Sequence, residues 1–324
     1  MIDQLPPSLT WNVYVNQWAD DRGGWSALAN ELIDRAANTD VPQDAQSVER
    51  GLRRLATREH KPGGQYGRWM LRYFGFIAAV DELVKWMGQY HTRFADLPCN
   101  FRLEHLTLWN RPPIAESRLA VWIQLGIAHA HRSKRAFDQA RHWQGLARRS
   151  APHAGRDAEI ECLLLDAQLL SDADTHATAD VLDAIAARLE GDPVFVAMLA
   201  DLRAHALIRP SGGNDRAAVL AAQAAYSEIP DSAEPFVAFR KAVGLGYCAW
   251  KLGDRAAAET FARAAVEHAG DGGLLRMRVN ALNLLTRVQD GAAARASHDR
   301  AARIAARLED EELMTRVANV IVPE

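Results

Sequence analysis

Residues 122–152 read WIQLGIAHAHRSKRAFDQARHWQGLARRSAP, and the interpretation of the whole chain starts from this stretch. Small residues recur in it at helical spacing, first at Gly126 and then at Ala140 and Ala147. Small side chains at these positions let two antiparallel helices approach closely, while the large Trp122 fills the space beside them. The stretch therefore predicts a closely packed helix pair.

The same stretch matches a repeat motif. Trp122, Leu125 and Gly126 stand at the W, L and G of that motif, and Ala140, Ala147 and Pro152 stand at its second-helix A, A and terminal P. In these residues the chain resembles a tetratricopeptide repeat, which implies helix pairs stacked into an α-solenoid. The interval from Gly126 to Ala140 is two residues longer than in the family pattern, and Gln144 replaces the second-helix aromatic, so extended helices are expected.

The pattern recurs about every forty residues through the rest of the chain. Equivalent small first-helix residues are Gly126, Ala167, Ala206 and Gly246. A less regular fifth pair is expected at 273–289 and 292–308, before a capping segment at 309–320. Four occurrences of the pattern at this interval predict at least four stacked antiparallel pairs.

The predicted fold class is all-α. We expect an N-terminal helical domain followed by a tetratricopeptide-like α-solenoid. In one of two interpretations the N-terminal domain is a winged helix-turn-helix. The expected boundaries are 1–96 for the first domain, 97–116 for a junction that contains Pro112-Pro113, and 117–324 for the repeat array.

Composition predicts a folded cytoplasmic protein. The chain is 48% hydrophobic and 24% charged, which excludes a disordered chain. Residues 1–10 lack the basic and apolar regions of a signal peptide, and no run approaches eighteen apolar residues. Cys99, Cys162 and Cys248 are scattered and form no CxxC motif, as is typical of a reducing compartment. We expect no membrane association.

Charge is divided unevenly between the two halves of the chain. Residues 1–150 hold 20 Lys and Arg against 15 Asp and Glu, whereas residues 151–324 hold 18 against 26. The excess of basic residues concentrates in 44–74 and 117–150. This division indicates a basic end that meets an anion and an acidic end that does not.

Amphipathic helices are predicted before the array, at 10–20, at 27–37 and after a capping Asp44. The third of these carries Val48, Leu52 and Leu55 at helical spacing. Its opposite face is expected to hold a row of arginines: Arg50, Arg53, Arg54 and Arg58. A basic, glycine-rich turn at 60–68 follows.

This order of elements, over residues 11–75, resembles a winged helix-turn-helix DNA-binding domain, in which residues 47–56 look like the recognition helix. The resemblance implies DNA contacts from Ser47, Arg50, Arg53, Arg54, Arg58, Lys61 and Arg68. The alternative is that these helices cap the repeat array and that the arginines lie on a solvated face. The sequence leaves both interpretations open.

The family resemblance also implies a binding site on the array. In tetratricopeptide proteins the concave wall comes from the first helices and binds extended peptides or partner helices. The implied peptide- or protein-binding residues are Arg203, Arg240, Tyr247, Trp250, Lys251, Asn280, Asn283 and Arg287. Asn280 and Asn283 lie one turn apart, so both amides can face a peptide backbone.

Sequence motifs give no support for catalysis. The chain contains no HExxH, P-loop or GxSxG motif. His129 and His131 are two residues apart and point to different helix faces, which does not suit one metal ion. We expect a non-enzymatic protein without a metal or cofactor.

The domain order resembles that of bacterial peptide-sensing regulators. The expected function is therefore regulation of transcription, with a peptide or protein in the repeat groove and DNA at the basic N-terminal helices. The alternative is an interaction adaptor or assembly factor that does not bind DNA. The sequence leaves open whether the protein forms a homodimer.

Overall fold

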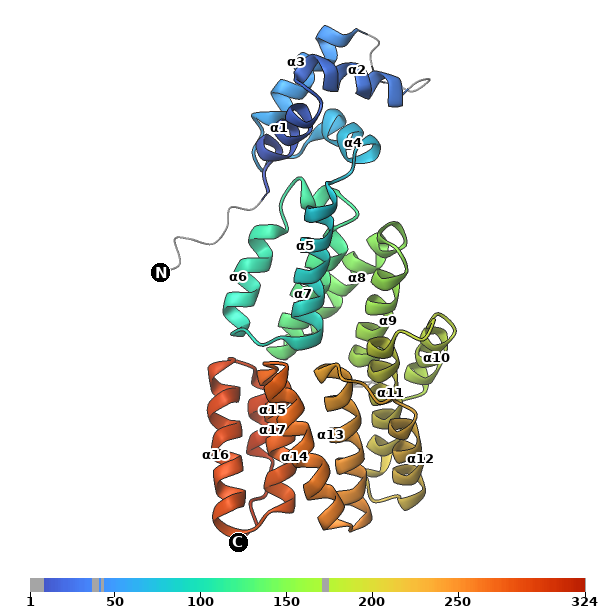
Figure 1. Ribbon diagram of the computed structural model, residues 1–324, viewed down its shortest axis with the longest axis vertical. Helices are drawn as coiled ribbons and strands as arrows, with labels where there is room; N and C mark the ends of the chain where they lie inside the picture. The colour runs from blue at the N-terminus through green and yellow to red at the C-terminus, as the bar shows by residue number, and fades with distance from the viewer. Residues whose placement is uncertain (1–8, 37–40, 42–43, 171–174, 324) are drawn as a thin grey trace.

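The computed structural model describes residues 9–36, 41, 44–170 and 175–323, and within these it forms seventeen α-helices and no β-strand (Figure 1). The predicted all-α class is confirmed. The helices follow one another as antiparallel pairs. No helix in the described residues is long and apolar enough to cross a membrane.

The α-helices are α1 (Trp11–Asp21), α2 (Trp25–Arg35), α3 (Ala45–Ala56), α4 (Gly64–Tyr73), α5 (Ala78–Gln89), α6 (Cys99–Trp109), α7 (Ala120–Ser133), α8 (Phe137–Ala154), α9 (Arg156–Leu170), α10 (Thr175–Ala186), α11 (Pro193–Ile208), α12 (Arg216–Ser227), α13 (Pro235–Leu252), α14 (Arg255–Asp271), α15 (Leu275–Val288), α16 (Gly291–Arg307) and α17 (Glu311–Ala318). The π-helix η1 (Tyr90–Phe94) follows α5, and the short 3-10 helices are η2 (Ile114–Glu116) and η3 (Arg209–Ser211).

Helices α1 to α4 form one end of the molecule (Figure 1). The Asp44 carboxylate caps α3 by accepting hydrogen bonds from the backbone N–H groups of Gln46 and Ser47. Val48, Leu52 and Leu55 are fully buried beneath that helix. The predicted apolar face of the third helix is therefore correct.

Two details of this end differ from the sequence prediction. Helix α3 stops at Ala56, so Arg58 lies in the following turn and does not extend the arginine row. The glycine-rich segment at 60–68, predicted as a turn that would be the wing of a winged domain, instead leads into helix α4. Its glycines allow this packing, because a Cβ at Gly63 would lie 2.3 Å from Trp11 Cζ2, and one at Gly67 would lie 2.9 Å from Trp11 Cη2.

The segment predicted as a junction contains helix α6, which packs on α7. Gly126 of α7 faces α6, because a Cβ there would lie 3.1 Å from Leu106 Cδ1 and 3.2 Å from His91 Cβ. The close approach predicted for Gly126 is therefore present, but its nearest atoms belong to α6 and η1 and not to α8. One apolar core runs from Trp11 to Leu169 and so continues across this segment.

Five antiparallel pairs make up the array, from α7 with α8 to α15 with α16, and α17 packs on the last of them. The predicted repeats at 273–289 and 292–308 correspond to α15 and α16. Pro152 does not end its helix as the motif suggested, since it lies in the last turn of α8, which continues to Ala154.

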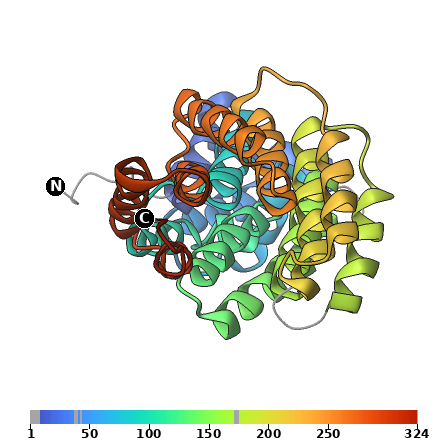
Figure 2. The same ribbon diagram turned by 90° about the horizontal axis from the view of Figure 1, so that it is seen from below.

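The array turns back on itself, so that its last helices lie beside its first (Figure 2). The Cys99 N–H donates to the carbonyl of Leu308 at 3.0 Å, and the rings of Phe94 and Phe236 lie 5.7 Å apart. These contacts join segments that are far apart in sequence, so the stacked helix pairs form a closed turn.

Gly246 of α13 provides a test of the packing. Its position is tight, because a Cβ would lie 2.9 Å from Leu284 Cδ2 and 3.0 Å from Phe261 Cβ. We expect Gly246→Leu to lower the free energy of unfolding by about 1–3 kcal/mol or more, since overpacking forces neighbours apart. Gly246→Ala should cost less, because alanine's higher helix propensity offsets part of the strain.

Urea denaturation measures both variants. The matched control is Gly145→Leu in α8, where an added Cβ meets no atom within 4 Å. Equal losses for Gly246→Leu and Gly145→Leu would contradict the packing described for Gly246.

Candidate functional site

A cavity of about 910 Å³ lies within the array. Its walls come mainly from α7, α11, α13, α15 and α17, most of which are first helices of their pairs. This volume falls within the range of about 300–1,000 Å³ typical of ligand pockets. The concave wall was predicted to come from first helices, and α7, α11, α13 and α15 line the cavity as predicted.

The cavity is rich in arginine. Seven arginines line it, against the carboxylates of Asp201 and Glu312: Arg93, Arg132, Arg209, Arg240, Arg276, Arg287 and Arg316. Five of the seven belong to the acidic half of the chain, residues 151–324. The net charge of this half therefore does not reveal that its interior carries five arginines.

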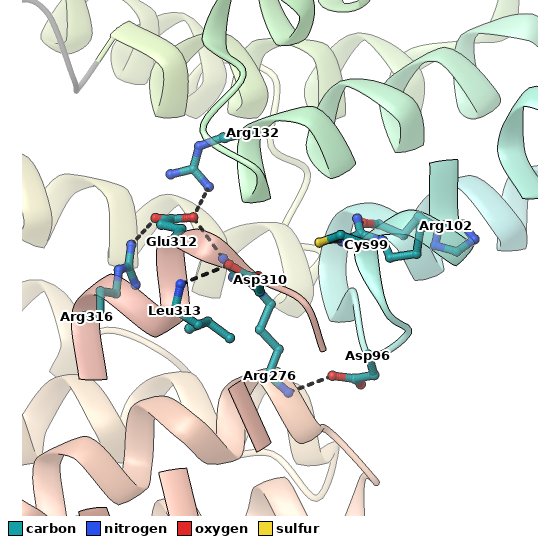
Figure 3. Close-up of polar contacts among 10 residues, drawn as sticks. Asp96, Cys99, Arg102, Arg132, Arg276, Asp310, Glu312, Leu313 and Arg316 are labelled. Carbon is teal, nitrogen blue, oxygen red and sulfur yellow. Dashed lines mark hydrogen bonds and ion pairs between the residues drawn. The ribbon is translucent and has the colours of Figure 1, made fainter. Parts of the chain in front are cut away.

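One end of the cavity is held together by ion pairs between distant helices (Figure 3). We call this set the closure cluster, and its members are Asp96, Arg132, Arg276, Asp310, Glu312 and Arg316. The Glu312 carboxylate accepts from Arg132 at 3.4 Å and from Arg276 at 3.1 Å, and it also pairs with Arg316. These three arginines come from α7, α15 and α17.

Arg276 connects the closure cluster to the N-terminal side of the array. Its Nε donates to Asp310 Oδ2 at 3.0 Å, and its backbone N–H donates to Asp96 Oδ1 at 2.7 Å. Asp310 has a second role, because its other oxygen accepts from the Leu313 N–H and so caps α17 (Figure 3). A single arginine therefore holds both the start of α17 and the segment before α6.

The protonation of Glu312 follows from this arrangement. Burial alone would raise its pKa, but the charges of Arg132, Arg276 and Arg316 outweigh burial and lower the pKa to about 2. Glu312 thus stays ionised in the folded protein. His129, on the same wall, has a pKa held well below its usual range by burial and by the nearby arginines, so it is neutral.

The middle of the cavity contains a second ion pair. Arg240 of α13 pairs with Asp201 of α11, and the Tyr226 hydroxyl donates to the same carboxylate at 3.0 Å. Burial would raise the pKa of Asp201, yet Arg240 and His205 lower it overall. The Tyr226 ring packs directly against Gly244, because a Cβ at Gly244 would lie 2.2 Å from that ring. Asp201 is therefore an ionised and fully engaged carboxylate.

The end of the cavity opposite the closure cluster is aromatic and cationic. Tyr247 and Trp250 of α13 pack edge to face at 5.5 Å between ring centroids. The guanidinium of Arg287 lies 5.0 Å from the Trp250 ring, and Lys251 Nζ lies 4.7 Å from the same ring. Both distances fit cation–π contacts.

Two asparagines lie along α15 between these ends. Asn280 and Asn283 both line the cavity. Asn283 is only 6% exposed, and its Oδ1 has no hydrogen-bond partner among the described residues. A buried amide without a partner is costly unless a ligand or water completes its hydrogen bonds.

Most of the predicted groove residues meet in this one place. Those that line the cavity directly are Arg240, Tyr247, Asn280, Asn283 and Arg287. Trp250 and Lys251 pack beside them, and Lys251 Nζ also donates to the Gly212 carbonyl at 2.9 Å. Arg203 lies outside the cavity lining and instead pairs with Asp183 of α10 at 3.3 Å.

The residues that the sequence did not reveal belong chiefly to the other walls. Arg93 precedes the array, and His129 and Arg132 belong to its first pair, for which no groove residues were predicted. Arg276, Glu312 and Arg316 belong to the closure cluster. The periodicity of α15 could have identified Arg276, since it lies four residues before Asn280 and on the same face. No local signal identified the others.

The predicted DNA-binding residues lie around α3 and the start of α4. Arg54, Lys61 and Arg68 are exposed. Arg53 pairs with Glu49 at 2.8 Å, and its guanidinium lies 4.8 Å from the Trp25 ring. The basic surface at this end is therefore present, and Arg53 is partly neutralised within it.

Three further predicted residues are held by local hydrogen bonds. Arg50 Nη2 donates to Ser47 Oγ at 3.1 Å, and the guanidinium of Arg58 donates to the Pro62 carbonyl. Ser47 and Arg50 are thus neighbours on α3, whereas Arg58 lies at the turn that precedes α4. The seven candidates share one end of the molecule without forming a single row.

Comparison of the chain with protein-family models, with curated proteins and with solved structures finds no match. Within the described residues, no group of three His, Cys, Asp or Glu side chains is placed to hold a metal ion.

The closure cluster predicts how stability depends on pH. The pKa of Glu312 falls from 4.5 to about 2 on folding. Its contribution to stability is therefore complete above about pH 4.5 and is lost as the pH falls toward 2. At about 1.4 kcal/mol per pH unit, Glu312→Gln should lower the free energy of unfolding by about 3 kcal/mol at pH 7.

Urea denaturation between pH 7 and pH 3 tests this expectation. The variant should also lose less stability on acidification than the wild type, because it lacks one carboxylate that must be protonated. Glu311→Gln, an exposed neighbour on α17, serves as the control. If both variants lose the same stability at pH 7, Glu312 does not hold the array closed.

Proposed function

We propose that the protein is a regulatory binding protein whose repeat cavity holds a peptide or a segment of a partner protein. The observation that carries this proposal is the cavity itself, with polar and aromatic side chains that converge from several first helices. Asn283 supports it, because its buried carbonyl lacks the donor that a peptide N–H would supply.

We further propose that the array is tetratricopeptide-like. The forty-residue recurrence supports this assignment, as do the small residues Gly246, Ala258 and Ala265, which are all buried where α13 and α14 pack. In such arrays the first helices form the binding wall, as the first helices form most of the walls here.

The second part of the proposed function is contact with DNA at the other end of the molecule. The exposed side chains of Arg54, Lys61 and Arg68 support it, as does the position of α1 to α4 at the end of the molecule away from α11 to α17 (Figure 1). A regulator needs such a separation, since both ligands must be able to bind at once. The alternative is an adaptor or assembly factor whose basic end binds a protein partner.

A variant that fills the cavity tests the first part. Asn280→Trp places a large ring on the cavity wall, so it should abolish binding of a fluorescent pool of random heptapeptides. Fluorescence anisotropy measures the binding, and the wild type should bind the pool. Arg303→Trp on the exposed side of α16 is the control and should bind like the wild type. Binding retained by Asn280→Trp would place the peptide elsewhere.

Charge reversal tests the second part. Arg53→Glu with Arg54→Glu should abolish binding to a fluorescent DNA duplex, and wild-type affinity should fall steeply as salt rises from 50 to 200 mM. Because Arg53 already pairs with Glu49, Arg54→Glu alone is the cleaner variant and should weaken binding by itself. Arg303→Glu is the control. Failure of the wild type to bind duplex at 50 mM salt would favour the adaptor.

A further inference from the structure

Two cations share one aromatic ring at the end of the cavity opposite the closure cluster. Lys251 Nζ and the Arg287 guanidinium lie 4.7 and 5.0 Å from the Trp250 ring centroid, so they are within about 10 Å of each other. Burial, and then the charge of Arg287, lower the pKa of Lys251. The two like charges therefore repel one another in a partly desolvated place.

The other cavity arginines whose partners are known are neutralised within the protein. Arg93 pairs with Glu161, Arg240 with Asp201, and the arginines of the closure cluster with Asp310 and Glu312. By contrast, no carboxylate of the described residues lies within ion-pair distance of Lys251 or Arg287. Arg287 on the cavity wall and Lys251 beside it thus have no carboxylate partner among the described residues, although Lys251 Nζ donates to the Gly212 carbonyl.

The neighbourhood of Arg287 contains a further polar group without a partner. Asn283 lies one turn earlier on α15 and lines the same cavity, with its Oδ1 buried and unbonded. A ligand that supplies both an anionic oxygen and an N–H donor satisfies the arginine and the asparagine together. A peptide has both groups within one residue.

We propose that the peptide bound in the cavity carries a carboxylate, which sits against Arg287 with Lys251 beside it, while a peptide N–H donates to Asn283. This proposal rests on the proposed peptide-binding function and adds its ligand class. The carboxylate comes either from an acidic side chain or from the peptide's C-terminus, because the chemistry of both is the same. Binding removes the repulsion between the two cations, so the free protein is already arranged for the anion.

The experiment compares three fluorescent heptapeptide pools by anisotropy with the full-length protein. One pool has acidic side chains and an amidated C-terminus, one has neutral side chains and a free C-terminus, and one has neutral side chains and an amidated C-terminus. At least one of the two carboxylate-bearing pools should bind about tenfold more tightly than the neutral amidated pool, as a charge-assisted hydrogen bond predicts. The pool that binds identifies the source of the carboxylate.

Substitutions then assign the site. Arg287→Gln should remove this tenfold preference, Lys251→Gln should reduce it, and Arg287→Lys should retain part of it. The control Arg303→Gln should leave it unchanged. Arg287→Gln should also keep or raise the thermal midpoint of unfolding, since it removes a repulsion, whereas a purely structural role for Arg287 would lower it.

The outcomes separate the two proposals. Equal binding of all three pools, or a preference that survives Arg287→Gln, overturns the carboxylate site while peptide binding stands. Binding of no pool overturns peptide binding and the carboxylate site together.

Discussion

The architecture depends on a carboxylate that three arginines share. Glu312 joins α7, α15 and α17, so one carboxylate pairs with arginines from the first and the last helices of the array. Isolated buried ion pairs often add little stability, because desolvation offsets their attraction. Buried ion pairs of this kind contribute to specificity, because a charge left unpaired inside the array would be costly. The closed arrangement pairs Glu312 with all three arginines. The Glu312 ion pairs therefore join the ends of the array around the cavity, whereas apolar packing between helices builds the cavity walls.

The repeat register identified much of this site from the sequence, and the reason is periodicity. Arg240, Tyr247, Asn280, Asn283 and Arg287 each lie on the inner face of a helix whose phase the small residues set, so one alignment placed them all. The closure cluster was beyond that reasoning. Its pairs join residues as far apart as Asp96 and Arg276, and contacts across such distances leave no trace in local spacing. The division of charge could not locate the cavity arginines for the same reason, because net charge does not reveal which side chains face inward.

The N-terminal end shows the same limit at a smaller scale. Its apolar face was predictable, since Val48, Leu52 and Leu55 recur at helical spacing. Helix α4 was not predictable, because glycines in a sequence indicate backbone freedom and do not show which residue will pack against them. Here Gly63 and Gly67 accommodate the ring of Trp11, a residue some fifty positions earlier, and α4 forms in consequence. The existence of α1 to α3 followed from local pattern, whereas α4 and the role of each glycine followed only from tertiary contacts.

Closure also changes how such an array is expected to come apart. In an open solenoid each repeat touches only its neighbours, so the terminal repeats fray first and amide hydrogens there exchange fastest with solvent. Contacts from the Cys99 segment to Leu308, and from Arg132 to Glu312, remove one of those free ends, because α17 cannot separate without exposing α7. Protection against exchange should then be nearly continuous around the array. Opening the cavity to admit a large partner becomes a concerted event and cannot proceed by peeling from the C-terminus.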